Sequence, residues 1–376
     1  MIATVQYKRV CLEGLGHVLP DEVISSAEIE QRLAPLYQRL RLPPGRLELM
    51  SGIRERRFFE PGALVSDVSI AAADRAIEQS GVDRRQIGAL VHGSVCRDFL
   101  EPATACRVHH TLGLPNNCAV YDVSNACLGL LSGAVQIANM IELGQISAGV
   151  VVGAELARPL VENTIERLNA DQSLTRASVK RWVASLTIGS AGAAMVLCDA
   201  SLSQTGNRLM ATAVHSDTGA HRLCQSEGLA EVMQTDSEAL LEAGVAAGAA
   251  TYSRFTELTG WETEGPNKTF CHQVGAAHRR SMLERLRLPV ENDYATYEWL
   301  GNTGSAALPS ALSLGLEAGW LAAGDRVGLL GIGSGVNCLM LGVDWQRAPV
   351  GASLCEQPVA EDRQPAGTLS NLKIAR

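Results

Sequence analysis

Short runs of apolar residues alternate along this chain with segments of helical periodicity, and this alternation constrains the fold more than any other feature. Residues 87–94 (IGALVHGS), 119–123 and 146–153 have the composition of buried strands, and helical segments separate them. Strands that are apolar on both faces are typical of a parallel-rich sheet covered by helices on both sides. The pattern therefore predicts an α/β fold.

The second half of the chain repeats this plan. Helical residues 239–259 precede a strand at 269–274, and helical residues 306–321 precede a strand at 325–331. A shift of 178 residues places Cys127 on Ser305, and a shift of 180 aligns 90–92 with 270–272. We therefore predict two similar halves with a site between them. The predicted division is residues 1–200, residues 201–345, a charged helical excursion at 156–185 and a polar tail at 346–376.

Composition excludes several classes of protein. The net charge of -8 and the low aromatic content of 4% argue against a nucleic-acid binder. The N-terminus lacks a signal-peptide pattern, and no apolar run is long enough for a membrane span. The ten cysteines form no CxxC pairs. We therefore expect a reduced, cytoplasmic protein.

We make specific predictions for five further local segments. A short strand at Val10 and Leu12 precedes a turn-like GLGHVLP, and residues 186–199 return as a pair of strands. Residues 25–40 form a helix capped near Ser26, and Ser66 or Asp67 caps another. The basic segment 51–59 (SGIRERRFF) fits either a solvated edge strand or a contact with an anionic substrate.

The segment 122–133 (DVSNACLGLLSG) is polar for four residues and then becomes a small-residue and leucine run. This places Cys127 at the first turn of a buried helix. Free backbone N–H groups and the positive end of the helix dipole favour a thiolate there, and the thiolate is the nucleophile. The alternative is a small core residue, because free cysteine is often buried.

Three segments of the second half carry further polar candidates. TFCHQV ends a strand with His272, GNTGSAALP holds Asn302 between Gly301 and Gly304 ahead of a helix, and LLGIGSGVN contains Ser334 in a glycine turn. Singly, each has a structural alternative: a core histidine, a helix cap or a plain turn. GxGSG is not a nucleotide signature here, because no helix with phosphate-binding spacing follows it.

Taken together, NACLG, HQ, GNTG and GxGSG resemble the thiolase-fold condensing enzymes, in particular the ketoacyl synthase III branch. SVCRDFLEPATA and LLGIGSGVNC are most similar to OleA-type enzymes, which join two fatty acyl-CoA thioesters head to head. The resemblance covers roughly residues 8–345. It implies a thiolase fold of duplicated halves in five α-β-α-β-α layers. It also implies a homodimer, acyl-CoA or acyl carrier protein as the acyl source, and no metal or other cofactor.

The same resemblance implies the roles of the site residues. Cys127 would carry the acyl chain, and the backbone N–H groups of Cys127 and Ser334 would bind the oxyanion. His272 and Asn302 would hydrogen-bond the carbonyl of the second thioester. Glu101 would be the base that removes its alpha proton, although an exposed loop carboxylate is the alternative. The residues expected to contact substrate are Arg54, Gly301, Gly304, Gly333 and Gly335.

The predicted activity is non-decarboxylative Claisen condensation through an acyl-cysteine, giving a 2-alkyl-3-ketoacyl product. Alternatives that the sequence leaves open are a decarboxylative 3-oxoacyl synthase III that uses malonyl-carrier protein, a pyrone-forming ketosynthase and a cysteine acyltransferase. A non-catalytic scaffold is disfavoured, because Cys127, His272 and Asn302 are all present.

Overall fold

The computed structural model describes residues 4–227, 232–272 and 274–351. Most of the predicted tail, from residue 352 onward, and Gln273 of the HQ motif lie outside the described residues. The strands are β1 (Thr4–Gln6), β2 (Val10–Val18), β3 (Glu22–Ser25), β4 (Glu55–Phe58), β5 (Ile87–His92), β6 (Ala119–Asp122), β7 (Ala148–Glu155), β8 (Ala191–Asp199), β9 (Arg208–Ser216), β10 (Cys224–Glu227), β11 (Val232–Thr235), β12 (Lys268–Cys271), β13 (Asp325–Gly333) and β14 (Asn337–Trp345). The α-helices are α1 (Ser26–Arg32), α2 (Ala34–Leu40), α3 (Arg46–Ser51), α4 (Val65–Ser80), α5 (Thr104–Leu112), α6 (Gly129–Glu142), α7 (Arg158–Ala170), α8 (Ser237–Thr259), α9 (Ala276–Leu286), α10 (Tyr297–Leu300) and α11 (Ala307–Glu317). The 3-10 segments are η1 (Arg84–Gln86), η2 (Ala126–Leu128), η3 (Ser178–Thr187), η4 (Thr218–Ala220), η5 (Val290–Asn292) and η6 (Gly304–Ala306).

Ten strands form a mixed sheet in the order β12-β13-β14-β9-β2-β8-β7-β5-β6, with β1 beside β9. We divide it into a first leaf (β2, β5, β6, β7, β8) and a second leaf (β1, β9, β12, β13, β14), which meet where Cys11 pairs with Arg208. Strand β5 runs parallel to β6 and β7, and β12 runs parallel to β13, whereas the other neighbours are antiparallel. The predicted predominance of parallel pairing is therefore wrong. One reason is that a tight turn joins β13 to β14, which forces an antiparallel pair.

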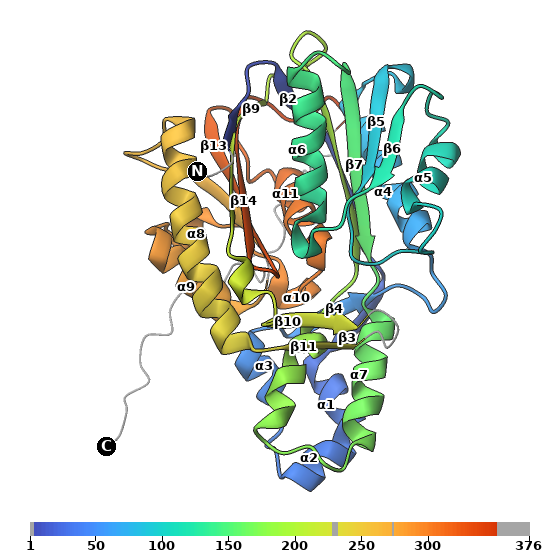
Figure 1. The fold of residues 1–376 in the computed structure, drawn as a ribbon, viewed down its shortest axis with the longest axis vertical. Coiled ribbons are helices and arrows are strands. Elements are labelled where there is room, and N and C mark those ends of the chain that lie inside the picture. The colour runs from blue at the N-terminus through green and yellow to red at the C-terminus, as the bar shows by residue number, and fades with distance from the viewer. Residues whose placement is uncertain (1–3, 228–231, 273, 352–376) are drawn as a thin grey trace.

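Helices and leaves stack in five layers, as predicted (Figure 1). Helices α4 and α5 cover the outer face of the first leaf, where they share one buried apolar cluster with β5, β7 and β8. Helices α8 and α9 cover the second leaf in a corresponding cluster. Helices α6 and α11 lie between the leaves and pack against both. The chain therefore has an α-β-α-β-α arrangement.

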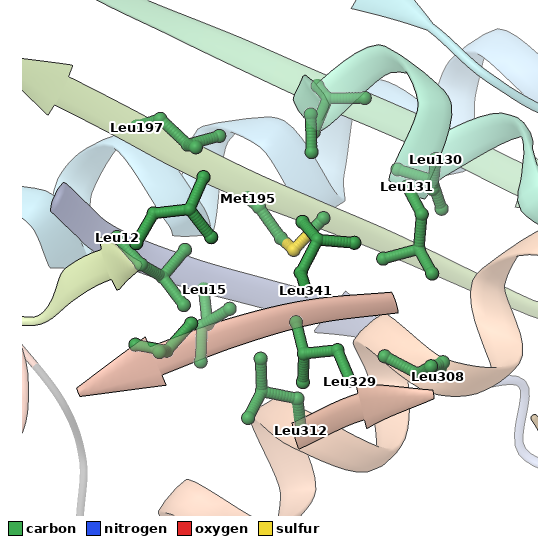
Figure 2. Close-up of a cluster of buried hydrophobic side chains, with 14 of the residues drawn as sticks. Leu12, Leu15, Leu130, Leu131, Met195, Leu197, Leu308, Leu312, Leu329 and Leu341 are labelled. Atoms are coloured by element: carbon green, nitrogen blue, oxygen red, sulfur yellow. The ribbon is translucent and has the colours of Figure 1, made fainter. Parts of the chain in front are cut away.

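The central layer is an aliphatic core with side chains from every element around it (Figure 2). Figure 2 labels Leu12, Leu15, Leu130, Leu131, Met195, Leu197, Leu308, Leu312, Leu329 and Leu341. Burial of one such side chain stabilises the fold by about 1.5–3 kcal/mol. Since this core holds α6 and α11 between the leaves, it also fixes the loops that precede the two helices.

The two helices of the central layer begin in the same way, 178 residues apart. Segment η2 leads into α6 at Gly129, and η6 leads into α11 at Ala307. The first residue of each 3-10 segment has a left-handed backbone, with φ of 45° at Ala126 and 56° at Gly304. The duplicated plan therefore extends to the backbone of these turns.

Two predictions for the first leaf are wrong. Strand β2 continues through the predicted turn, because its glycines let α4 lie against it: a Cβ on Gly14 would be 2.3 Å from the carbonyl oxygen of Ala76. The predicted strand pair at 186–199 is the end of η3 followed by the single strand β8. Glycine-rich strands have weak local signals, so contact with α4 rather than propensity decides β2.

The helix boundaries also differ from the prediction. The helix expected at 25–40 is divided at Leu33 into α1 and α2, and its cap is Ser25, which forms a capping box with Glu28. Helix α4 begins at Val65 without a side-chain cap. In the basic segment, β4 pairs with β3, but Arg56 is fully buried rather than solvated.

The charged excursion forms a separate lower part of the molecule (Figure 1). Helix α7 and η3 pack with α1 and α2 around a further buried apolar cluster. No helix among the described residues is both long and apolar enough to cross a membrane.

Candidate active site

The turn that carries Cys127 is held by an unusually close approach between α6 and β5. A Cβ on Gly129 would lie 2.5 Å from the carbonyl oxygen of Gly93, which follows β5, and a Cβ on Gly93 would meet Gly129 at 2.4 Å. Ala126 has φ of 45°, a conformation that non-glycine residues rarely adopt. The sharp turn therefore presents Cys127 just before the helix, between the two leaves.

Two backbone N–H groups lie near the sulfur of Cys127. They belong to Cys127 itself and to Ser334, and their positions favour the thiolate. Strand β13 delivers Ser334, since a Cβ on Gly333 would lie 3.6 Å from the backbone nitrogen of Cys127. These are the two donors that the resemblance implied, and the structure brings them together.

Side-chain amides fix the two turns relative to each other. Asn337 donates from Nδ2 to Oδ1 of Asn125 at 3.2 Å, and Asn125 donates to the hydroxyl of Ser132 at 2.9 Å. This chain of hydrogen bonds links the start of β14 to the nucleophile turn and to α6. The position of Ser334 relative to Cys127 is therefore set by both halves of the chain.

The resting ionisation of Cys127 differs from the prediction. Burial, with the nearby carboxylate of Glu155 and the thiol of Cys224, raises the pKa of Cys127 to about 12, and this outweighs the two N–H donors. The expected lowering of the thiol pKa by the helix start is therefore wrong for this state. Desolvation wins because Cys127 lies in η2, before the first turn of α6, where the helix dipole is weaker, while the half-buried site removes water from the sulfur.

His272 directly follows β12, and its backbone N–H donates to the carbonyl of Leu330 in β13 at 3.1 Å. Phe270 packs in the central layer and Cys271 in the outer cluster with α8 and α9, so alternation directs His272 toward the central layer. His272 is 4% exposed, and burial with nearby His278 lowers its pKa to about 3. The imidazole is therefore neutral at neutral pH, with one N–H to donate.

Asn302 lies in a turn that needs glycine at position 301. Gly301 has φ of 68°, and a Cβ there would lie 2.7 Å from the carbonyl oxygen of Thr187. Oδ1 of Asn302 accepts from the backbone N–H of Gly304 at 3.0 Å, which orients the amide and leaves Nδ2 to donate elsewhere. The side chain is largely buried at the end of α10.

Glu101 and Arg54 lie away from this cluster. Glu101 is on an exposed loop before α5, next to Phe99 and Leu100, which are 62% and 95% exposed. Arg54 is also exposed, and its backbone N–H donates to the carbonyl of Glu298. A single chain therefore brings the Ser334 turn to the nucleophile and buries His272 and Asn302, whereas it leaves the predicted base on its surface.

Sequence reasoning missed Glu155 and Cys224. Glu155 ends β7 and is 4% exposed, and Cys224 begins the β10-β11 hairpin; both act on the ionisation of Cys127. A charged residue closing the all-apolar strand GVVVGAE is the signal that could have identified Glu155. Cys224 has no such local signal. In the part of the chain that the structure covers, no group of three or more His, Cys, Asp or Glu side chains could hold a metal ion.

Comparison with known proteins assigns the class. Residues 60–181 match the thiolase N-terminal domain, and residues 257–345 match the C-terminal domain of 3-oxoacyl-[acyl-carrier-protein] synthase III. The first match contains Cys127, and the second contains His272, Asn302 and Ser334. The fold and site are thus those of a thiolase-fold acyltransferase.

Two curated relatives narrow this class. The acyl-CoA:acyl-CoA alkyltransferase of Shewanella oneidensis is 44% identical over 91% of this chain and 100% of the relative. The enzyme of the same name from Xanthomonas campestris is 34% identical over 90% of this chain and 99% of the relative. The chain therefore belongs to the acyl-CoA:acyl-CoA alkyltransferase (OleA) family.

Solved structures of OleA have a fold similar to that of this chain. A cysteine-to-alanine variant of Xanthomonas campestris OleA has a TM-score of 0.87 at 33% identity, covering 91% of this chain and 98% of that chain. A cysteine-to-serine variant of the same enzyme, crystallised with lauric acid and lauroyl-CoA, has a TM-score of 0.86 at 33% identity, covering 90% and 100%.

Proposed function

We propose that this protein joins two fatty acyl-CoA thioesters by non-decarboxylative Claisen condensation and releases a 2-alkyl-3-ketoacyl product. The observation that carries the proposal is the close approach of the Gly333–Ser334 turn to the backbone of Cys127, in a chain 44% identical to an acyl-CoA:acyl-CoA alkyltransferase. The lauroyl-CoA bound to the Xanthomonas enzyme supports a long acyl chain on CoA as the substrate.

In the first half-reaction the Cys127 sulfur attacks the thioester carbon. A sulfur–carbon bond forms, the bond to the CoA sulfur breaks, and CoA leaves with the proton that Cys127 gives up. The negative charge that develops on the carbonyl oxygen is held by the N–H groups of Cys127 and Ser334. Because the resting thiol is neutral, its proton leaves as attack proceeds rather than beforehand.

In the second half-reaction His272 and Asn302 act on the second thioester. The neutral imidazole N–H and the Asn302 Nδ2 donate to its carbonyl oxygen and stabilise the enolate that forms when the alpha proton is removed. The enolate carbon attacks acyl-Cys127, so a carbon–carbon bond forms while the carbon–sulfur bond to Cys127 breaks. The Cys127 thiolate then recovers a proton.

Glu101 is the proposed base for that alpha proton, and a homodimer is the proposed means of placing it. Its loop carries Phe99 and Leu100, which are exposed in a single chain and suited to burial against a second copy. Crystallised variants of Xanthomonas OleA include substitutions of one glutamate and of one cysteine. The number of residues between those two positions equals the number between Glu101 and Cys127. This spacing supports a shared role.

Further proposed contacts concern the substrate. Exposed Arg54 is suited to the phosphates of CoA, and the glycines of the two active-site turns allow the acyl thioester to approach the backbone. These glycines are Gly301, Gly304, Gly333 and Gly335. We expect the reaction to take place in the cytoplasm. We also expect it to need no metal or other cofactor, because acyl-CoA and the side chains account for every proton and bond above.

Glu101→Gln tests the reaction type. The variant should acylate Cys127 at a near-normal rate, but condensation should fall by about 10²–10⁴-fold, the usual contribution of a positioned base. Glu60→Gln is a matched control, since Glu60 is also exposed and also precedes a proline. Products from two acyl-CoAs, with and without a malonyl thioester, are identified by mass spectrometry.

The outcomes separate the candidate activities. The C-terminal match to 3-oxoacyl synthase III is the observation that favours a malonyl-dependent alternative. Condensation that requires the malonyl thioester, or that proceeds equally in wild type and Glu101→Gln, would replace the proposal with that alternative. A pyrone product or acyl transfer to an alcohol or amine would identify the other two.

A further inference from the structure

The side chain of Glu155 is a buried carboxylate that joins two segments far apart in sequence. It accepts hydrogen bonds from the backbone N–H groups of Val95 at 3.0 Å and Cys96 at 3.2 Å. It also accepts from Ser305, through the backbone N–H at 3.3 Å and the hydroxyl at 2.6 Å. Across the described ranges, no Lys, Arg or His side chain lies within ion-pair distance of this carboxylate, so its charge is held by hydrogen bonds alone.

Each joined segment carries a proposed catalytic group. Val95 and Cys96 begin the loop that leads to Glu101, and Ser305 ends the turn that contains Asn302. The contact with this turn is close, because a Cβ on Gly304 would lie 3.0 Å from Cγ of Glu155. Movement of Glu155 would therefore move the Asn302 turn and the base of the Glu101 loop together.

The same carboxylate lies beside the nucleophile turn, because it bonds to Ser305 in η6, and η6 packs against η2, which carries Cys127. The titratable groups that act on Cys127 are Glu155 and Cys224, opposed by the N–H groups of Cys127 and Ser334. A carboxylate without a cationic partner in a buried site disfavours a second negative charge nearby. Its position therefore favours the neutral thiol.

We propose that Glu155 is a positioning residue that holds the Asn302 turn and the Glu101 loop in register and that places a negative charge beside the turn that carries Cys127. That charge favours the neutral thiol of Cys127 between turnovers. A neutral thiol reacts slowly with adventitious electrophiles and oxidants, so the nucleophile is protected until a thioester occupies the amide donors. The positioning role rests on the proposed condensation, whereas the charge effect does not.

The variants Glu155→Gln and Ser305→Ala test the two effects of Glu155, its charge near Cys127 and its hydrogen bonds to the two segments. Glutamine removes the charge and turns an N–H₂ group toward backbone N–H donors that need an acceptor. Ser305→Ala keeps the carboxylate but removes its 2.6 Å hydroxyl donor, so the charge facing Cys127 is less compensated. Two readouts are measured: condensation of acyl-CoA, and alkylation of Cys127 by iodoacetamide, followed by peptide mass spectrometry at a fixed, mildly alkaline pH.

Condensation should fall in both variants, whereas the alkylation rate should change in opposite directions. Condensation should fall about tenfold or more in Glu155→Gln and less in Ser305→Ala. Alkylation should accelerate in Glu155→Gln by about threefold, because a tenfold gain in thiolate is partly offset by its lower nucleophilicity, and it should slow in Ser305→Ala.

Unchanged or slower alkylation in Glu155→Gln would overturn the charge effect. Normal condensation in both variants would overturn the positioning role. If Glu155→Gln does not fold, Ser305→Ala alone decides, since an alkylation rate equal to wild type contradicts the inference. If neither the wild type nor any variant condenses acyl-CoA, the proposed function is wrong. The alkylation rates still test the charge effect in that case.

Discussion

Replacing Gly129 by alanine tests how far the nucleophile turn depends on the close approach of α6 to β5. The new Cβ would lie 2.5 Å from the carbonyl oxygen of Gly93 and 2.7 Å from its carbonyl carbon. Ordinary contact begins near 3.4 Å, so the two backbones must separate by up to about 0.9 Å. Both contacts are backbone atoms, so no side chain can rotate to relieve them.

The magnitude follows from this displacement. Overpacking costs about 1–3 kcal/mol of unfolding free energy, and the better helix propensity of alanine recovers at most about 1 kcal/mol. With that recovery, the net loss in unfolding free energy should be about 0–2 kcal/mol. The effect on chemistry should be larger, because misplacing a catalytic group by about 1 Å can reduce a rate about 100-fold. Acylation of Cys127 should fall by about 10- to 100-fold.

Two measurements check this prediction. Single-turnover acylation by a long-chain acyl-CoA is followed by intact-protein mass, and the unfolding free energy is measured in urea. Gly244→Ala in α8 is the matched control, since its Cβ would meet Ile332 at an ordinary 3.7 Å; it should be neutral or stabilising. Acylation and stability equal to wild type in Gly129→Ala would refute the dependence of the turn on this contact.

Three further predictions concern the site and pH. Cys127 should be acylated by a long acyl-CoA while Cys271, which packs in the outer cluster, is not; a mass shift that persists in Cys127→Ser would contradict this. His272→Ala and Asn302→Ala should retain acylation but lose condensation in single-turnover assays, and a variant that fails only at acylation would show that the roles are misassigned. Burial lowers the pKa of His92 to about 4, so this histidine stabilises the fold fully above its unfolded pKa of about 6.5, and the contribution is lost as pH falls toward 4. His92→Gln should therefore reduce the slope of unfolding free energy between pH 6 and 5 by about 1.2 kcal/mol per pH unit, and an unchanged slope would exclude this contribution.

Periodicity predicted the class of fold but not its strand directions. The alternation of apolar strands and helices is a local signal, and strands β5, β7, β12 and β13 lie where that signal placed them. The antiparallel insertion of β8 depends on where the chain returns after α7 and η3, which local pattern does not encode. The extension of β2 depends on contact with α4, since Gly14 and Gly16 have little strand propensity of their own.

Some residues of the site could also be predicted from local sequence, whereas others could not. Cys127, His272 and Asn302 each occur in a short motif, and the order of these motifs along the chain let the sequence indicate them together, although each motif alone is ambiguous. Glu155 has no motif, because its partners are Val95, Cys96 and Ser305, and their proximity exists only in the folded chain. The ionisation of Cys127 was mispredicted for a related reason. A helix start is visible in sequence, whereas burial and a facing carboxylate are not.

The duplicated turns explain why one helix start became the nucleophile site and the other its support. Each turn has a left-handed residue followed by a side chain that can bond or react: Ala126 then Cys127, and Gly304 then Ser305. In the second turn glycine is favoured, because φ is 56° and a Cβ would lie 3.0 Å from the Glu155 side chain. Ser305 donates to that carboxylate, whereas Cys127 lies against the Gly333–Ser334 turn at the end of β13. A thiol at position 305 would therefore face a carboxylate rather than that turn, so an exchange of the two side chains should not move the reaction to the other turn.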